Sequence, residues 1–328
     1  MYLAHSAKGD IPAQSYQEHV CNVYEVAFGN AARAGAYSKY GALMKDAVAV
    51  AARYHDLGKL APENQQVLKS SNRESLPLHH WDAGVAALQS GGLTLAENLA
   101  ALFVYSHHIG LQSLPDENAK GKGNVFRDIS LCLEGRSVKN IVDKSLHDYL
   151  ETHKSAITEL PEMEKSAWQG VVSPLFMRMA LSCLVDADHT DTARHYNNIV
   201  PEGEILLQPD KRLDSLDKYV AVLAKKPLGN VKRNKLRQEI YDSSRNASLS
   251  DKGFITCDSP VGTGKTTAVM GHLLNVAKTK NLQRIFVVLP FTNIIDQSVD
   301  TYRKALVLDG ENPEKVVAAH HHKAEYED

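Results

Sequence analysis

The sequence predicts a mainly α-helical bundle followed by a shorter α/β segment that carries a phosphate-binding loop. Apolar residues recur at three- and four-residue spacing from residue 14 to about residue 200, as in Val20, Val23, Tyr24 and Ala27, which is the period of amphipathic helices. After residue 250, short apolar runs flank a glycine-rich turn, a pattern typical of a strand–loop–helix unit. A chain of 328 residues is long enough for two such domains.

The composition excludes several classes of protein. Hydrophobic residues make up 43% and charged residues 23% of the chain, so it can bury a core and is not disordered. Its 37 basic and 39 acidic residues give a net charge of -2, which excludes a uniformly basic nucleic-acid-binding surface but not a local basic groove. Four widely spaced cysteines without a Cys-x-x-Cys pair argue against a disulfide framework or a thiolate zinc site and favour the cytoplasm. We also expect no membrane segment, because no apolar run approaches about 18 residues.

Within the helical part, apolar runs at 47–54, 95–104 and 175–185 predict buried helices. The polar, glycine-bearing stretch 114–124 predicts a mobile loop. The chain then becomes polar and locally basic, which predicts a linker over 206–250 with room for one bridging helix. We therefore expect a first domain at 1–205 and a second at 251–328.

The second domain is expected to begin with a strand at 254–257, followed by the turn Gly262-Thr263-Gly264 and a helix over 266–280. The apolar run at 284–289 is that of a buried parallel strand.

Histidine is abundant, with 15 residues in the chain, and several histidines interrupt apolar helical stretches together with aspartate. These interruptions are His19, His55-Asp56, His79-His80, His107-His108, Asp186 and Asp188. Burying one such group without a partner costs several kcal/mol, and a shared metal site would satisfy all of them together. Imidazole and carboxylate are the ligands that divalent first-row metals take from helices around a bundle core.

Adjacent residues on a helix point roughly 100° apart, so His55 and Asp56 can approach one metal from two sides while the carboxylate bridges to a second ion. Two ions about 3.5–4 Å apart can activate water and stabilise a phosphoryl group during displacement. Lys59 follows within about one turn and could stabilise negative charge there. A lone histidine is more often a core or surface residue, and we expect Asp82 and Asp191 to be solvated.

The order of these residues resembles the HD superfamily of metal-dependent phosphohydrolases. Segments 2–6, 14–19 and 52–60 are similar to the CRISPR-associated type I nuclease–helicase family, in which an HD nuclease precedes a superfamily 2 helicase. The resemblance implies that His19, His55, Asp56 and a late Asp hold one metal, with Asp56 bridging, and that His80, His107 and His108 hold the other. It favours His80 over His79, because Gly84 stands where the family has a small residue, and Asp188 over Asp186, because Asp188 follows Ala187.

Residues 259–267 match a phosphate-binding loop except at Ser259, where the general pattern has glycine. Gly262 and Gly264 would let backbone N–H groups approach phosphate, Lys265 would meet the β- and γ-phosphates, and Thr266 could bind Mg²⁺, with Thr263 and Thr267 completing the loop. The chain contains no Asp-Glu-x-His or Asp-Glu-x-Asp after this loop. We expect a truncated, RecA-like helicase domain that does not hydrolyse ATP, with ATP and Mg²⁺ used only by a full-length helicase.

The resemblance implies a nuclease that cuts single-stranded DNA in CRISPR interference, recruited by an RNA-guided surveillance complex. The histidine-rich ligand set favours Mn²⁺, Fe²⁺, Co²⁺ or Ni²⁺ over Mg²⁺ alone. Trp81 and Tyr105 could stack on bases, and Lys120, Lys122 and Arg127 could attract the phosphate backbone or form an ordinary solvated loop. Two alternatives are a phosphohydrolase acting on nucleotides and a non-catalytic scaffold that recruits a partner complex.

Overall fold

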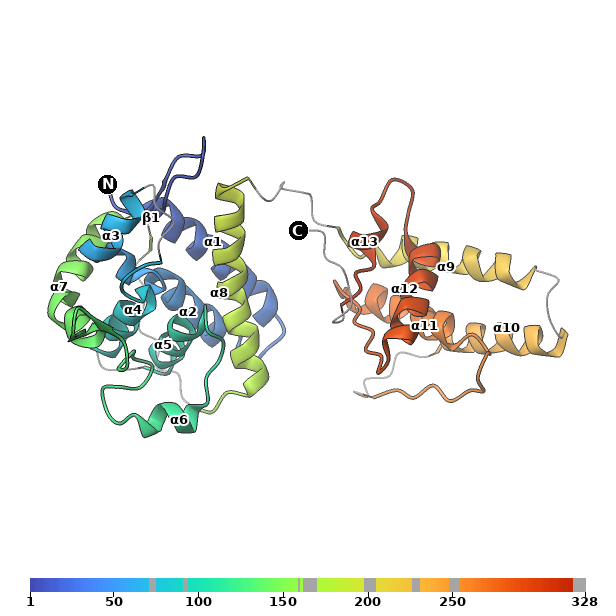
Figure 1. The fold of residues 1–328 in the computed structure, drawn as a ribbon. Coiled ribbons are helices and arrows are strands. Elements are labelled where there is room, and N and C mark those ends of the chain that lie inside the picture. The colour runs from blue at the N-terminus through green and yellow to red at the C-terminus, as the bar shows by residue number, and fades with distance from the viewer. Residues whose placement is uncertain are drawn as a thin grey trace. The chain divides into compact units, whose positions relative to one another are not determined.

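The predicted mainly α-helical class is confirmed by the computed structural model, which describes residues 1–70, 75–90, 94–158, 160–161, 170–197, 205–225, 231–247 and 254–320 (Figure 1). The chain divides into two units, Met1–Pro201 and Glu202–Asp328. Among the described residues, no helix is both long enough and apolar enough to cross a bilayer.

The first unit is a bundle of helices with two small antiparallel β-ladders. The helices are α1 (Tyr16–Gly35), α2 (Gly41–Tyr54), α3 (Pro62–Lys69), α4 (His80–Gln89), α5 (Leu95–Ser106), α6 (Leu114–Ala119), α7 (Val138–Ala156) and α8 (Pro174–His195), with a 3-10 turn, η1 (Leu57–Leu60), after α2. β1 (Leu3–His5) pairs with β2 (Gln14–Ser15), and β3 (Cys132–Leu133) pairs with β4 (Arg136–Ser137).

Polar caps explain where three of the long helices begin. Ser15 accepts a hydrogen bond from the Glu18 backbone N–H at the start of α1. Thr94 and Glu97 form a reciprocal capping box at the start of α5. Ser173 caps α8, whose first residue is a proline. Each cap satisfies a backbone N–H that has no partner within its own helix.

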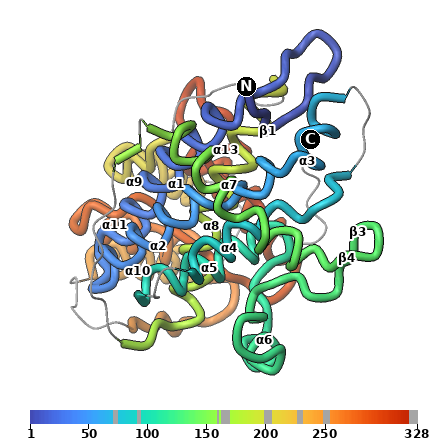
Figure 2. The backbone as a smooth tube through the Cα atoms, turned by 90° about the vertical axis from the view of Figure 1, so that its left-hand side faces the viewer, coloured from blue at the N-terminus to red at the C-terminus, as the bar shows by residue number. Residues whose placement is uncertain are grey.

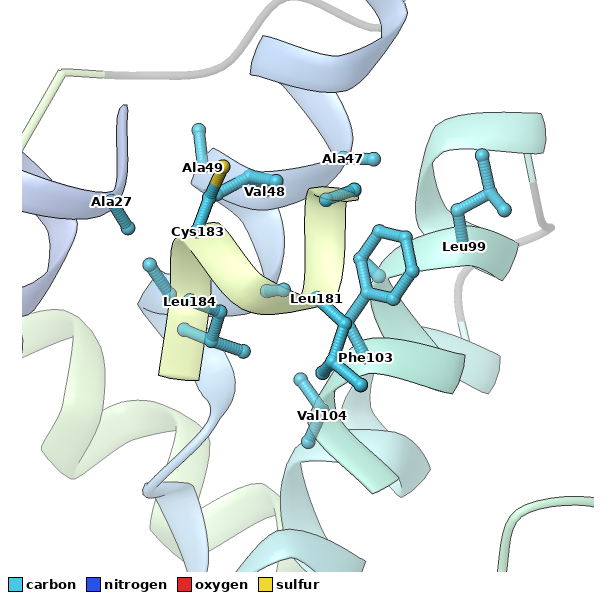
Figure 3. Packing of buried hydrophobic residues seen from close by; sticks show 14 of the residues in the cluster. Ala27, Ala47, Val48, Ala49, Leu99, Phe103, Val104, Leu181, Cys183 and Leu184 are labelled. Carbon is cyan, nitrogen blue, oxygen red and sulfur yellow. The ribbon is translucent and has the colours of Figure 1, made fainter. Parts of the chain in front are cut away.

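The core of this unit lies between α1, α2, α5 and α8. Small side chains of α1 and α2, such as Ala27 and Val48, face larger ones of α5 and α8, such as Phe103 and Leu184 (Figure 3), and these four are fully buried. Alternation of small and large residues lets helices approach closely and fill the space between them. The three helices predicted from apolar runs, α2, α5 and α8, therefore all contribute to the core.

Two glycines let α4 approach the end of α2. In Figure 2, α2, α4 and α5 lie side by side. A Cβ atom at Gly84 would stand 2.1 Å from the Tyr54 carbonyl oxygen, and one at Gly58 would stand 2.5 Å from the His80 carbonyl oxygen. Any side chain at either position would push α4 away. The glycines therefore set the separation between His80 and the segment that contains Asp56.

The stretch 114–124, predicted to be a mobile loop, is helical over its first half as α6. Pro115 occupies the first turn, and Asp116 and Glu117 lie near the helix N-terminus, where acidic residues are favourable. The loop prediction from polarity and glycine was wrong for this half because it overlooked these helix-start signals.

The second unit is also helical, with α9 (Pro209–Ala224), α10 (Val231–Arg245), α11 (Lys265–Lys280), α12 (Thr292–Leu306) and the short α13 (Pro313–Val316). Leu213 and Leu216 of α9 and Tyr241 of α10 are buried in a cluster with residues of α11 and α12. The region predicted to be a linker thus contains two helices that supply core residues. Its expected start at residue 206 lies shortly before α9, and its expected end at residue 250 lies outside the described residues.

The strands predicted at 254–257 and 284–289 are not formed in the described part of the chain, where neither run belongs to a strand or pairs with one. Phe254 is 95% exposed and Phe286 82% exposed. A parallel strand is stable only when neighbouring strands take its hydrogen bonds and helices cover its faces. Apolar composition predicted strands here, but it could not supply those neighbours.

The close approach of α4 can be tested with Gly84→Ala. We expect it to lower the free energy of unfolding by roughly 1–3 kcal/mol, because the added methyl group collides with backbone rather than with a movable side chain. Gly29→Ala in α1 is the matched control, since its Cβ would meet nothing within 4 Å and should be neutral or stabilising by about 0.5–1 kcal/mol. Urea denaturation of the full chain measures both, and equal midpoints for the two variants would contradict the packing described.

A buried histidine of α7 should make stability depend on pH. Burial, with the Arg53 guanidinium nearby, lowers the pKa of His153 to about 4, and the ring is hydrogen-bonded to the Tyr16 hydroxyl at 2.9 Å. Its folded-state pKa lies below its unfolded value of 6.5, so its contribution is complete above pH 6.5 and is lost as the pH falls towards 4, by at most about 3 kcal/mol.

We therefore expect His153→Gln to reduce the loss of unfolding free energy between pH 7 and pH 4. His147→Gln, at an exposed position of the same helix, should leave the slope unchanged. Urea titrations across this pH range provide the measurement, and parallel slopes for all three proteins would show that His153 does not titrate as described.

Candidate metal centre

Seven histidine and aspartate side chains from separate segments of the first unit lie together in space. They are His19 of α1, His55 and Asp56 after α2, His80 at the start of α4, His107 and His108 after α5, and Asp188 of α8. Two groups among them, His19–His55–Asp188 and His80–His107–His108, each have ligand atoms within 4.8 Å of one another. Both clusters could hold a metal ion.

The group His19–His55–Asp188, here called the deeper group, has the spacing of ligands around one ion. His19 Nε2 lies 3.3 Å from both His55 Nε2 and Asp188 Oδ1, and it lies 3.1 Å from Asp56 Oδ2. Metal bonds of about 2.0–2.2 Å to nitrogen and oxygen place neighbouring ligand atoms about 3.0–3.5 Å apart. Both histidines are fully buried and Asp188 is 5% exposed, so the group is largely shielded from water.

Hydrogen bonds to the second ring nitrogen orient the buried histidines. His55 Nδ1 lies 2.8 Å from the Ala52 carbonyl oxygen and His107 Nδ1 lies 2.6 Å from the Val104 carbonyl oxygen. A carbonyl oxygen only accepts, so Nδ1 carries the proton and Nε2 keeps its lone pair in the neutral ring. This arrangement is usual for histidines that bind a metal through Nε2.

The group His80–His107–His108, here called the outer group, lies nearer the surface. In it His107 is buried, His80 is partly buried and His108 is exposed. The Nε2 atoms of His80 and His107 are buried and make no hydrogen bond with any described residue. An unsatisfied buried nitrogen costs free energy, and a metal ion would remove that cost. The residues present therefore fit a cation.

Asp56 connects the two groups. Its Oδ2 lies 3.1 Å from His19 Nε2 and 2.7 Å from the Lys59 ammonium, whereas its Oδ1 lies 3.4 Å from His80 Nε2. The carboxylate thus presents one oxygen to each group. Lys59, which is 7% exposed, sits in η1 rather than on a continuation of α2, because α2 ends at Tyr54.

The electrostatic field keeps most candidate ligands in the protonation state that metal binding requires. Burial disfavours the Asp56 carboxylate, but Lys59 and the surrounding histidines outweigh it and hold the pKa of Asp56 well below its usual range. Burial holds the pKa of His80 well below its usual range, and burial together with His108 lowers the pKa of His107 to about 3. These groups are therefore anionic or neutral at pH 7.

His19 behaves differently without a metal. Burial opposes its charge, but hydrogen bonds to Asp188, Asp191 and Asp56 outweigh burial and raise the pKa of His19 to about 10. Without a metal, the extra proton on His19 supplies the positive charge that balances these carboxylates. A bound cation could supply the same charge. Metal binding through His19 must displace this proton.

The two members of each pair of alternative ligands lie in different surroundings. His80 belongs to the outer group, whereas His79 forms an ion pair with Asp128. Asp188 faces His19, whereas Asp186 is exposed and accepts a hydrogen bond from the Asn30 side chain.

Asp191 and Asp82, which we expected to be solvated, are buried, so that prediction was wrong. Asp191 Oδ2 lies 2.7 Å from His19 Nδ1 and accepts a hydrogen bond from the Gln14 side chain, while Asp191 Oδ1 accepts one from the Asn22 side chain. Asp191 lies three residues after Asp188, on the helix face that carries the apolar core residues, and this period was the signal that could have identified it.

The basic residues expected to attract nucleic acid are used differently. Arg127 is buried and paired with both Asp82 and Asp143, while Lys120 pairs with Glu117. Their positive charges are therefore largely neutralised within the unit, and the proposed attraction of a phosphate backbone loses its basis at Arg127.

In the second unit, the predicted phosphate-binding loop precedes α11 as expected. Gly262 and Gly264 have φ angles of +78° and +85°, Thr263 is buried, and Thr266 and Thr267 lie in the first turn of α11. Lys265 Nζ donates to the Ser259 carbonyl oxygen at 2.6 Å. The loop thus has the backbone conformation that only glycine adopts easily, followed by the N-terminus of a helix.

Comparison with known proteins finds no matching family model and no matching curated protein. The geometry of the two ligand groups is therefore the main basis for a functional proposal.

The role of Asp188 can be separated from that of its neighbour on α8. We expect Asp188→Asn to weaken Mn²⁺ or Co²⁺ binding by at least the roughly 10–100-fold that loss of an outer-shell partner causes. Asp186→Asn removes the same charge from an exposed position and should leave affinity unchanged. Isothermal titration calorimetry of the metal-free variants measures both, and equal losses would indicate a general effect of charge.

Proposed function

We propose that the first unit is a two-metal phosphodiesterase of the HD type that cleaves single-stranded DNA. The observation that supports this most directly is the position of Asp56, whose two oxygens face two separate groups of ligands. A carboxylate between two cation sites is the arrangement expected of a two-metal hydrolase. A site for one structural ion would not need it.

The ligands suggest which ions the centre takes and what they contribute. Imidazole nitrogens outnumber carboxylate oxygens, which favours Mn²⁺, Fe²⁺, Co²⁺ or Ni²⁺ over Mg²⁺. Bound ions would polarise a phosphodiester and make water more acidic. His19, His55, Asp56 and Asp188 would hold one of them, and His80, His107 and His108, with the second oxygen of Asp56, would hold the other.

Lys59 would assist in two ways. Its ammonium lies 2.7 Å from Asp56 Oδ2 and is almost fully buried, so it orients the carboxylate. A cation held in a low-dielectric site can also stabilise negative charge that develops on a phosphodiester. Gln65 fixes this segment by donating to the Lys59 carbonyl oxygen at 2.7 Å.

An aromatic side chain beside the outer ligand group supports a nucleic-acid substrate. The Trp81 ring is partly buried, with its centroid 5.8 Å from that of His108 and 4.4 Å from that of His79. Stacking on an aromatic ring requires a base that is not already stacked in a duplex. Trp81 therefore favours single-stranded substrates. Tyr105, 9% exposed and hydrogen-bonded to Lys120, is a weaker candidate.

The resemblance to CRISPR-associated nuclease–helicases supplies the biological part of the proposal. It assigns antiviral interference in the cytoplasm and recruitment by an RNA-guided surveillance complex. The glycine-rich loop before α11 would bind the phosphates of ATP with Mg²⁺ in a full-length helicase. The four cysteines form no disulfide, which is compatible with a reducing compartment.

The proposal predicts that the purified chain, loaded with Mn²⁺, Co²⁺ or Ni²⁺, cleaves circular single-stranded DNA. Asp56→Asn should lower the rate by at least about 100-fold, because both ion sites lose a charged ligand. Lys59→Ala should lower kcat by about 100–1,000-fold without changing the metal content measured by elemental analysis. Asp186→Asn should retain the wild-type rate.

Three outcomes would redirect the proposal. Release of phosphate from nucleotides without DNA cleavage would indicate a small-molecule phosphohydrolase on the same scaffold. Wild-type nuclease activity of Asp56→Asn after metal removal and reloading would exclude the proposed centre, and a metal-loaded chain inactive on both substrates would favour a recruitment scaffold.

A further inference from the structure

A third group of possible ligands lies at the edge of the metal centre. His108, Asp188 and His189 have ligand atoms within 4.8 Å of one another. His189 has no place in either of the other two groups, and nothing in the sequence pattern assigned it a role. Asp188 belongs also to the deeper group and His108 to the outer one.

Exposure to water increases from the deeper group to this third one. His19 and His55 are fully buried, and His107 and Asp188 are 3% and 5% exposed. His108 and His189 are both exposed. A hydrated cation approaching from solution can therefore exchange water for these two imidazoles before it can reach any nitrogen of the deeper group.

The shared residues make the third group an alternative to the outer group rather than an additional site. A neutral imidazole has only one nitrogen with a free lone pair, so His108 can bind a cation in one group at a time. Asp188 has two carboxylate oxygens and can contact a cation on either side. An ion held by the third group is thus already bound to one member of each permanent group.

We infer that His189, together with His108 and Asp188, forms the entry site at which a divalent cation leaves water before it moves to the two buried groups. This inference rests on the proposed metal centre. It assigns His189 a kinetic role: the residue provides a route into and out of the centre, and it is not a ligand of the resting ions.

Such a role has a distinct thermodynamic signature. A residue on the entry route lowers the barrier equally in both directions, so its removal slows association and dissociation by the same factor and leaves the equilibrium constant unchanged. A permanent ligand instead stabilises the bound state, so its removal weakens affinity and speeds dissociation.

The test is rapid mixing of the metal-free full chain with Co²⁺, followed by the visible absorption of the bound ion, with release measured after addition of excess chelator. We expect His189→Ala to slow both association and dissociation several-fold, with the Kd and the number of ions bound unchanged. His147→Ala, at an exposed histidine on α7, is the matched control and should behave as wild type. Circular dichroism verifies that each variant is folded.

Three outcomes would overturn the inference. Unchanged rates in His189→Ala would show that ions enter elsewhere, and a weaker Kd with faster release would make His189 a permanent ligand. In both cases the proposed metal centre would stand, because the wild-type chain still binds Co²⁺. A wild-type chain that binds no Co²⁺ would instead remove the centre itself, and the entry site with it.

Discussion

The buried carboxylate of Asp56 is the constraint around which the first unit is organised. An ionised group that is 1% exposed is stable only when opposite charge and hydrogen-bond donors surround it. Lys59 supplies the nearest positive charge, while His19 and His80 approach from opposite sides. Lys59 is a near neighbour in sequence, but His19 and His80 belong to α1 and α4, so compensating one carboxylate brings separate helices to a common point.

Helix ends, rather than helix middles, provide much of the site. His55 and His107 follow the last residues of α2 and α5, and His80 is the first residue of α4. Unpaired carbonyl groups are available in the last turn of a helix, and those of Ala52 and Val104 orient the two preceding rings through Nδ1. The apolar bodies of the helices can therefore pack tightly while their ends present polar atoms to the shared site.

In the second unit, two helices hold the loop that the sequence predicts to bind phosphate. Arg233 and Arg237 of α10 donate to the carbonyl oxygens of Val261 and Gly262. These contacts hold the loop from the α10 side, and the N-terminus of α11 holds it from the other. Composition predicted a linker with room for one helix over 206–250, and α10 lies in this segment. Its many Lys and Arg side chains lie on an exposed helix face.

The sequence by itself determined the helical period of the first unit, the chemical types of the possible ligands and the glycine-rich loop, because each depends on local spacing. Only the tertiary structure shows that Asp188 and His80 join the two groups of possible ligands, while Asp186 and His79 make other contacts. Residues two apart on a helix point about 200° apart, so packing turns Asp188 inward and Asp186 outward. The tertiary structure also decided that Asp191 is buried and that the runs at 254–257 and 284–289 lack strand partners. Both outcomes depend on which distant segments of the chain come close.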